Sequence, residues 1–199
     1  MQLRRDDVVD GALTILDDYG LADLTMRRLA GSLGVAPGAL YWHVSNKQAL
    51  IGAVSDRILS RLDTVPAAGT PDVLDAVRRR AHGLRDALLA HRDGAEVVAS
   101  SLSARTVTHP VRATFVHDLL ATGLSPDDAG HAADALLYYV LGATSDEQSR
   151  LQMESAGALA ADLHARDDGG LDRDATARFD FGLELFVDGV RSRVRTLNE

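Results

Sequence analysis

Residues 24–50 read LTMRRLAGSLGVAPGALYWHVSNKQAL, and they contain two short segments with helical periodicity that meet at Gly34. The first segment begins after Thr25, whose hydroxyl can cap a helix, and its apolar residues are Met26, Leu29, Ala30 and Leu33. The second segment covers 35–44, and a helix tolerates Pro37 in its first turn because no N–H is needed there. Two short helices joined at a glycine predict a helix-turn-helix, whose second helix enters the major groove of DNA.

The second helix is expected to divide its residues between a core face and a DNA face. Its inward positions are Val35, Ala39, Leu40 and Val44, and its outward positions are Pro37, Gly38, Tyr41 and Trp42. The two outward aromatic residues combine a flat apolar ring with an O–H or N–H, which suits thymine methyl groups, sugars and phosphates. Ser45 and Gln48 predict a capping box for the next helix, where free backbone N–H groups and Lys47 can hold a phosphate.

Each of these features also has a simpler structural interpretation. A Tyr–Trp pair on a helix often belongs to a core, and Arg27 with Arg28 can form an ordinary solvated helix face. A capping box indicates only that a helix begins. Because all of these features fall at mutually consistent positions within one short stretch, DNA binding is the favoured interpretation.

The charge of the chain is unevenly distributed. The 199 residues carry a net charge of −8, which by itself argues against a nucleic-acid partner, because phosphate binding depends on Lys and Arg. Residues 1–62 are neutral overall, and residues 63–199 carry the whole −8. No Asp or Glu occurs between Asp23 and Asp56. That interval contains the basic residues Arg27, Arg28 and Lys47, so the sequence predicts a positive patch on an acidic protein.

Helical periodicity also dominates the rest of the chain, and we find no convincing two-residue alternation of the kind a strand shows. The only obvious linker is TVPAAGTP at 64–71. We therefore predict an all-α fold with an N-terminal three-helix helix-turn-helix DNA-binding domain at 1–62 and a larger helical domain at 63–199. A long helix is expected from Ser125 to about Met153, and its mixture of large and small residues lets two helices approach closely. A last helix is expected at about 175–197, and it carries an apolar stripe: Phe179, Leu183, Phe186, Val190, Val194 and Leu197.

Composition excludes several classes of protein. The chain has no cysteine, so disulfides, thiolate metal sites and thiol catalysis are excluded. It has no apolar run of the length that a membrane span needs, and its start, MQLRRDDVVD, turns acidic where a signal peptide would turn apolar. We therefore expect a soluble, cytoplasmic protein with no membrane partner.

The stretch at 24–50 resembles the DNA-binding helices of the TetR family of bacterial repressors. It is especially similar to the tetracycline repressor subgroup, in which L-Y-W-H-V and the following N-K recur. Three later stretches also resemble that subgroup's ligand-binding and dimerisation domain: LLAHRDGAEV at 88–97, YVLGATSDEQ at 139–148 and FGLELFVDGV at 181–190. The resemblance thus covers nearly the whole chain.

The resemblance implies a homodimer that binds a palindromic double-stranded DNA operator and is released by a small-molecule inducer. By position, Arg27 is expected to read a guanine, and Thr25 and Lys47 are expected to hold phosphates. The expected recognition surface is formed by Ala36, Pro37, Gly38, Tyr41, Trp42 and His43. The helix from Ser125 and the last helix are expected to pack with their dimer copies into a four-helix bundle.

The resemblance also implies an inducer pocket, but one that differs from the pocket of the tetracycline repressors. In that subgroup a histidine after the H-R-D-G-A-x-V motif ligates the metal of the drug, and the same position here is Val98, which has no lone pair to donate. We therefore expect a largely hydrophobic inducer bound without a metal or another cofactor. The expected pocket residues are His82, Leu84, Val98, Leu102, Phe115, Leu119, Tyr138 and Asp146. Each of them has the alternative interpretation of an ordinary core residue of a helical domain.

The alternative function is a small all-α metal-dependent enzyme. His109 and His117 are eight residues apart and could share a helix face with Asp118 nearby. Against this, the seven histidines form no H-E-x-x-H motif, and the chain has no G-x-S-x-G, P-loop or Rossmann glycine pattern. We therefore expect no catalytic residues. A purely architectural DNA-binding protein is disfavoured as well, because a large acidic domain adds nothing to non-specific DNA affinity.

Overall fold

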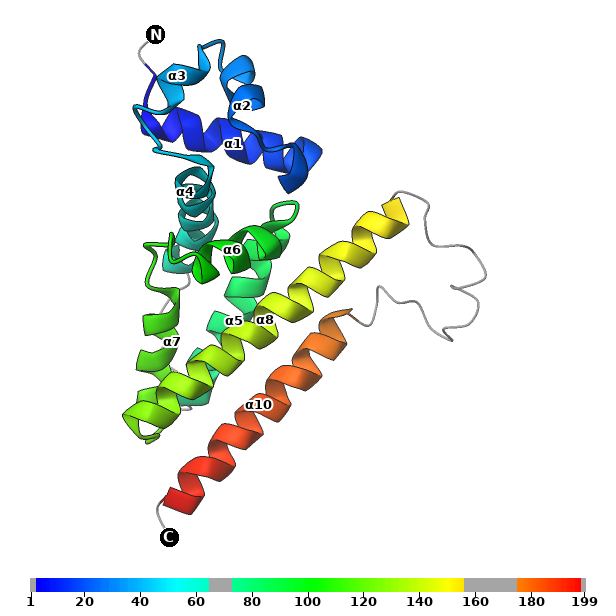
Figure 1. The fold of residues 1–199 in the computed structure, drawn as a ribbon. Coiled ribbons are helices and arrows are strands. Elements are labelled where there is room, and N and C mark those ends of the chain that lie inside the picture. Colours follow the sequence, from blue (N-terminus) through cyan, green and yellow to red (C-terminus); the bar gives the residue numbers. More distant parts are fainter. Residues whose placement is uncertain (1–2, 65–72, 156–174, 198–199) are drawn as a thin grey trace. The chain divides into compact units, whose positions relative to one another are not determined.

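The structure, a computed structural model, describes residues 3–64, 73–155 and 175–197, and within these ranges it contains helices and no strand (Figure 1). The all-α prediction is therefore confirmed. The backbone packs as two compact units: unit 1 comprises Met1–Thr64 and Leu84–His109, and unit 2 comprises Val65–Gly83 and Pro110–Glu199. No helix of the described ranges combines the length and the apolar character needed to cross a bilayer.

Unit 1 consists mainly of short helices. Its elements are α1 (Arg5–Tyr19), η1 (Leu21–Asp23), α2 (Met26–Ser32), α3 (Pro37–Leu40), α4 (Lys47–Leu59), η2 (Ser60–Thr64), the end of α5 (Val73–Leu89) and α6 (Gly94–Ser103), where η marks a 3₁₀ helix. Helices α1 and α4 pack against each other, and their inward side chains, among them Leu16, Leu50 and Val54, are fully buried. Full burial of such a side chain contributes roughly 1.5–3 kcal/mol to folding.

The ends of the first helices follow the sequence closely. Helix α1 ends at Gly20, whose φ of 83° suits glycine and whose N–H donates to the carbonyl of Leu16 at 2.8 Å. The hydroxyl of Thr25 caps α2 by accepting the N–H of Arg28 at 3.1 Å. Gly34, with φ of 66°, makes the turn between α2 and α3. The sequence predictions for Thr25 and Gly34 are confirmed.

Two local predictions around the second helix are wrong in detail. The expected capping box of Ser45 and Gln48 does not form, because Asn46 directly precedes α4 and its Oδ1 accepts the N–H of Ala49 at 2.8 Å. The predicted helix at 35–44 is regular only over Pro37–Leu40. It then tightens into a turn, since the N–H of His43 and the N–H of Val44 both donate to the carbonyl of Leu40, at 2.9 and 3.0 Å.

Helix α4 is joined to α6 and to the segment after α6 within unit 1. The hydroxyl of Ser55 donates to the hydroxyl of Ser101 at 2.8 Å, and both residues are buried. Asp56 accepts the backbone N–H groups of Thr108 and His109 at 2.8 and 2.9 Å. These bonds satisfy polar groups that would otherwise destabilise the folded chain, and they fix the helix that begins at Lys47.

Unit 2 is built from longer helices. Besides the first part of α5 it contains α7 (Val111–Leu120), α8 (Pro126–Ser155) and α10 (Ala175–Leu197), and both α7 and α10 pack on α8. Ser125 caps α8, because its hydroxyl accepts the N–H of Asp128 at 3.1 Å. The predicted linker at 64–71 lies almost entirely outside the described residues, and the domain boundary after residue 62 stays a prediction.

Candidate nucleic-acid interface

The aromatic residues after α3 are exposed to solvent. Trp42 is 89% exposed and Tyr41 is 53% exposed, whereas Leu40 and Val44 on the opposite side are buried. The predicted outer face is therefore confirmed, and so is the core position of Leu40 and Val44, whereas the other two residues expected on the core face, Val35 and Ala39, are half-buried. A tryptophan in this position does not contribute to the core of unit 1, which removes the simplest structural explanation for it.

The surface around the aromatic pair is open. Ala36, Pro37 and Gly38 are all exposed, and a Cβ added at Gly38 would have no heavy atom within 4 Å. A low helix surface of this kind lets the backbone approach the edges of bases. His43 is half-buried at the end of the turn. The nine residues that the sequence analysis expects to contact DNA are called the DNA-facing surface below: Thr25, Arg27, Ala36, Pro37, Gly38, Tyr41, Trp42, His43 and Lys47.

The cations of this surface differ in how they are held. Arg27 and Lys47 are exposed, and neither forms an ion pair with any residue that the structure describes. Arg28 is instead paired with Asp23. Lys47 is the first residue of α4, so it stands at the positive end of that helix, where the first backbone N–H groups have no partner within the helix. Arg27 and Lys47 therefore leave positive charge available to an anion, and Arg28 does not.

The acidic residues of α1 are engaged elsewhere. Arg57 on α4 donates to Asp10 at 2.5 Å and to Asp6 at 3.0 Å. Asp7 accepts the backbone N–H of Arg4 at 2.8 Å. The cation of Arg57 thereby offsets part of the negative charge that Asp6 and Asp10 would otherwise present to a polyanion.

The residues expected to bind an inducer belong to both units. In unit 1, Leu84 and Val98 are buried and Leu102 is half-buried. In unit 2, Phe115 and Leu119 are fully buried and lie one turn apart on α7. Their assignment to a pocket stays a prediction.

The polar members of that set have other contacts in unit 2. The Nε2 of His82 lies 3.4 Å from a carboxylate oxygen of Asp180, and its ring meets the ring of Phe179 edge-on, with 5.3 Å between centroids. Tyr138 is largely exposed on α8. Asp146 accepts from Arg150 at 2.9 Å and lines a small pocket of about 220 Å³ together with Tyr139, Glu147, Arg178 and Phe179. Of these pocket residues only Asp146 was expected from the sequence, although Phe179 was visible as the start of the apolar stripe.

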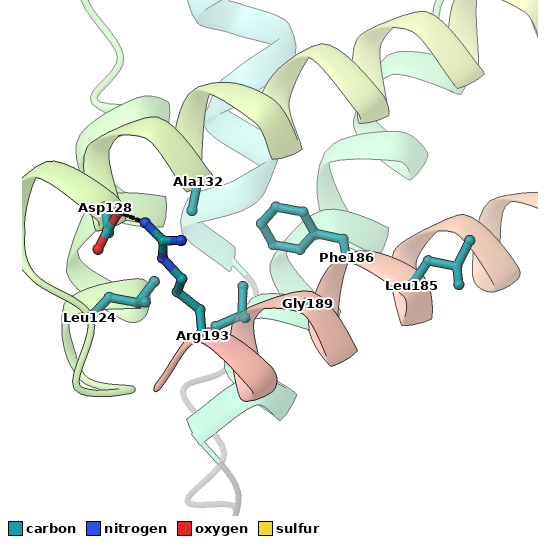
Figure 2. Close-up of a pocket in the computed structure, with 8 residues that line it drawn as sticks. Leu124, Asp128, Ala132, Leu185, Phe186, Gly189 and Arg193 are labelled. Atoms are coloured by element: carbon teal, nitrogen blue, oxygen red, sulfur yellow. Dashed lines mark hydrogen bonds and ion pairs between the residues drawn. The ribbon is translucent and has the colours of Figure 1, made fainter. Parts of the chain in front are cut away.

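A larger apolar groove of about 320 Å³ lies between α8 and α10. It is lined by Leu124, Asp128, Ala132, Leu185, Phe186, Gly189, Val190 and Arg193. Figure 2 shows Arg193 reaching from α10 to Asp128 near the start of α8, and the two side chains are 3.2 Å apart. The rest of the groove is almost wholly apolar, so it suits a hydrophobic occupant with few polar groups.

Two ion pairs of unit 2 shift the pKa values of Glu184, Asp134 and Arg112. A hydrogen bond from Arg78 on α5 holds the pKa of Glu184 on α10 below its ordinary value, although desolvation opposes this shift. In the same way the hydrogen bond between Arg112 and Asp134 lowers the pKa of Asp134 and raises that of Arg112. Both pairs join neighbouring helices, which indicates a structural role.

The alternative of a metal-dependent enzyme finds no support in the geometry. The part of the chain that the structure describes holds no group of three or more His, Asp or Glu side chains able to bind a metal ion. His109 belongs to unit 1 and the exposed His117 belongs to unit 2.

Known proteins are similar to this chain in both sequence and fold. The family description "Bacterial regulatory proteins, tetR family" matches residues 8–54, and "Tetracyclin repressor-like, C-terminal domain" matches residues 65–168. The tetracycline repressor protein class C of Escherichia coli is 34% identical over 216 aligned positions, which cover 100% of this chain and 95% of the relative.

Solved structures agree with these matches. BioQ of Mycobacterium smegmatis is 46% identical with a TM-score of 0.82, covering 96% of this chain and 99% of that one. A structure of BioQ with its natural double-stranded DNA operator is 43% identical with a TM-score of 0.78, covering 95% and 98%. A TetR variant of Acinetobacter baumannii AYE in complex with minocycline is 28% identical with a TM-score of 0.75, covering 96% and 98%. The chain therefore belongs to the TetR family of bacterial transcriptional regulators, with a C-terminal domain of the tetracycline repressor type.

Proposed function

We propose that this chain is a ligand-responsive transcriptional repressor that binds a palindromic operator as a homodimer and is released by a small-molecule inducer. The observation that carries the DNA-binding part is the exposure of Trp42 and Tyr41 on a segment without any carboxylate. Exposed aromatic rings next to free cations suit a partner that offers both apolar base edges and phosphates. The structure of BioQ with its double-stranded DNA operator supports an operator as the partner of this chain.

Each member of the DNA-facing surface has a proposed role. Arg27 donates two hydrogen bonds to a guanine, a contact for which the planar guanidinium is suited. Thr25 and Lys47 hold phosphates on either side of the groove. Ala36, Pro37, Gly38, Tyr41, Trp42 and His43 contact base edges and sugars.

The homodimer uses the helices α8 and α10. Large apolar side chains are exposed on these two helices of the protomer, namely Tyr138, Leu151, Met153, Phe181 and Leu185, and the apolar groove lies between the helices. Covering such a surface with a second copy removes apolar area from water. Two-fold symmetry then places two recognition segments about 34–36 Å apart, which matches successive major grooves.

The inducer is proposed to be a largely hydrophobic organic molecule. The eight residues expected at its pocket include the buried apolar side chains Leu84, Val98, Phe115 and Leu119. Val98 replaces the imidazole that the tetracycline repressors use for a metal ion, so we propose binding without a metal. Regulation of this kind takes place in the cytoplasm and requires no catalysis by the chain.

The DNA-binding proposal is tested by selecting operator sequences from a randomised pool of duplexes with the wild-type protein. For the most enriched duplex, Arg27→Ala should cost about 1–3 kcal/mol and relax the preference at one base position in each half-site. Lys47→Ala should weaken the binding of all duplexes alike and flatten its salt dependence. Arg105→Gln, which removes an exposed cation outside the DNA-facing surface, is the control and should bind like wild type. If both surface variants bind like wild type, the proposed surface is wrong.

A further inference from the structure

Two adjacent arginines at the start of α2 are held in opposite ways. Arg27 is exposed, and its side chain forms no hydrogen bond or ion pair within the described part of the chain. The guanidinium of Arg28 is paired with Asp23 on η1, and its Cζ lies 4.1 Å from the ring centroid of Tyr19, the last residue of α1. The backbone N–H of Arg28 also donates to the capping hydroxyl of Thr25. Arg28 therefore connects α1, η1 and the start of α2.

These contacts change what Arg28 can offer to DNA. A guanidinium carries one positive charge, and the carboxylate of Asp23 already neutralises much of it. Exchanging that carboxylate for a phosphate would gain little, whereas Arg27 loses no partner when it meets DNA. The residue that is free to read DNA is therefore Arg27.

The same contacts restrict the movement of α2. This helix has only seven residues, and a helix of that length is not stable by itself in water. Its direction depends on tertiary contacts, and the ion pair and the cation–π contact of Arg28 supply two of them on the side that leads to α1. A change in the direction of α2 would move Arg27 away from the base that it reads.

We propose that Arg28 is a positioning residue, which uses Asp23 and Tyr19 to hold α2 in the orientation that presents Arg27 to the operator. Arg28 itself does not bind a phosphate. The inference rests on the proposed function and extends it, because it gives an acidic residue and an aromatic residue outside the DNA-facing surface a part in operator binding.

Replacing Asp23 distinguishes a positioning role of Arg28 from a direct phosphate contact, because the two roles predict opposite changes in DNA affinity. If Arg28 bound a phosphate, Asp23→Asn would release it from a competing partner and strengthen DNA binding. If Arg28 positions α2, the same substitution should weaken binding although it removes a negative charge near the DNA. We expect the DNA affinity of the homodimer to fall about tenfold, because the substitution removes two copies of the Asp23–Arg28 pair. A tenfold loss of affinity corresponds to about 1.4 kcal/mol of binding free energy.

The experiment measures the affinity for the most enriched duplex at several salt concentrations. Asp23→Asn, Tyr19→Leu and Arg28→Lys should each weaken binding, because a lysine cannot pair and stack as the planar guanidinium does. Tyr19→Phe keeps the ring face and should bind like wild type. The slope of log affinity against log salt should stay unchanged in the weakened variants, whereas Lys47→Ala should make it shallower by about 1.8 for two lost phosphate contacts per dimer.

A double-mutant cycle tests whether Arg28 acts through Arg27. In the Arg27→Ala background, Asp23→Asn should change affinity by less than about twofold, because residues that work as one unit are not additive. Tighter binding by Asp23→Asn, or an equal loss in both backgrounds, would overturn the inference and leave the proposed function intact. Amide hydrogen exchange in α2 without DNA should be faster in Asp23→Asn and Tyr19→Leu, and unchanged exchange would also overturn it. A selection that enriches no duplex would instead refute the proposed function.

Discussion

Gly182 on α10 lies directly against the phenol of Tyr139 on α8: a Cβ at residue 182 would be 2.3 Å from the tyrosine hydroxyl oxygen and 2.6 Å from its Cζ. The phenol cannot easily move away, because its O–H donates to the carbonyl of Phe179 at 2.7 Å and its ring stacks on the ring of Phe179. The missing side chain at Gly182 is therefore what lets α10 approach α8 at this point.

Gly182→Ala should destabilise the chain by about 1–3 kcal/mol, because the added methyl group forces the tyrosine out of a well-packed position. The measurement is urea denaturation at one fixed protein concentration, since the stability of a dimer depends on concentration. Gly31→Ala is the matched control: a Cβ at Gly31 on α2 would meet nothing within 4 Å, so this change should be neutral or stabilising by up to about 1 kcal/mol. Equal stabilities of the two variants would contradict the packing argument.

Leu185→Glu should prevent dimer formation without unfolding the protomer. Leu185 is 59% exposed and lines the apolar groove, so a carboxylate there stays hydrated in the monomer but loses water in the proposed dimer interface. Sedimentation at micromolar concentration should show monomers, and operator affinity should collapse because two half-sites are no longer read together.

Val190→Glu is the informative comparison for Leu185→Glu. Val190 lines the same groove but is only 6% exposed in the protomer, so a carboxylate at this position should unfold the protomer itself. Circular dichroism separates the two outcomes. A dimeric Leu185→Glu chain, or a wild-type chain that sediments as a monomer, would refute the proposed interface.

Tetracycline with magnesium should not release this protein from its operator. Val98 is fully buried on α6 and has no atom able to bind a metal, and Asp146 is paired with Arg150. Hard cations such as magnesium need several oxygen or nitrogen ligands in a defined arrangement. Titration of the protein–operator complex with the drug and magnesium checks this. Release at low micromolar drug that a chelator abolishes would overturn the prediction.

The stability of unit 2 should fall in acid in part through Glu184. The hydrogen bond from Arg78 lowers the pKa of Glu184 in the folded chain. The pair therefore stabilises the fold fully above the pKa of an unfolded Glu, about 4.3. This stabilisation is lost as the pH falls through the lower pKa of the folded chain. Glu184→Gln should reduce the free energy of unfolding by at most about 1 kcal/mol near neutral pH, because the pair is partly exposed. The difference from wild type should disappear at low pH. A difference that persists there would exclude the ion pair as its cause.

The sequence by itself determined the helix-turn-helix, because the interactions that define it are local. Thr25 caps α2 from three residues away, and Gly20 and Gly34 adopt the positive φ angles that end helices. Helical periodicity alone predicts the outer face for Trp42, and the side chain is indeed exposed there. The residues of the inducer pocket came from resemblance rather than from local chemistry, and they remain a prediction.

Only the tertiary structure decided between residues of the same chemical type. Ser45 and Asn46 are both good helix caps, and the structure shows that Asn46 is the one that caps α4. Arg27 and Arg28 are neighbours of the same residue type, and the sequence does not distinguish them. In the structure only Arg28 forms the ion pair with Asp23 and the cation–π contact with Tyr19. Gly182 and Tyr139 are about forty positions apart in the sequence, and no local pattern predicts that they meet. A local pattern extends over one or two helical turns, whereas the partner of a side chain depends on which distant helix the fold brings beside it.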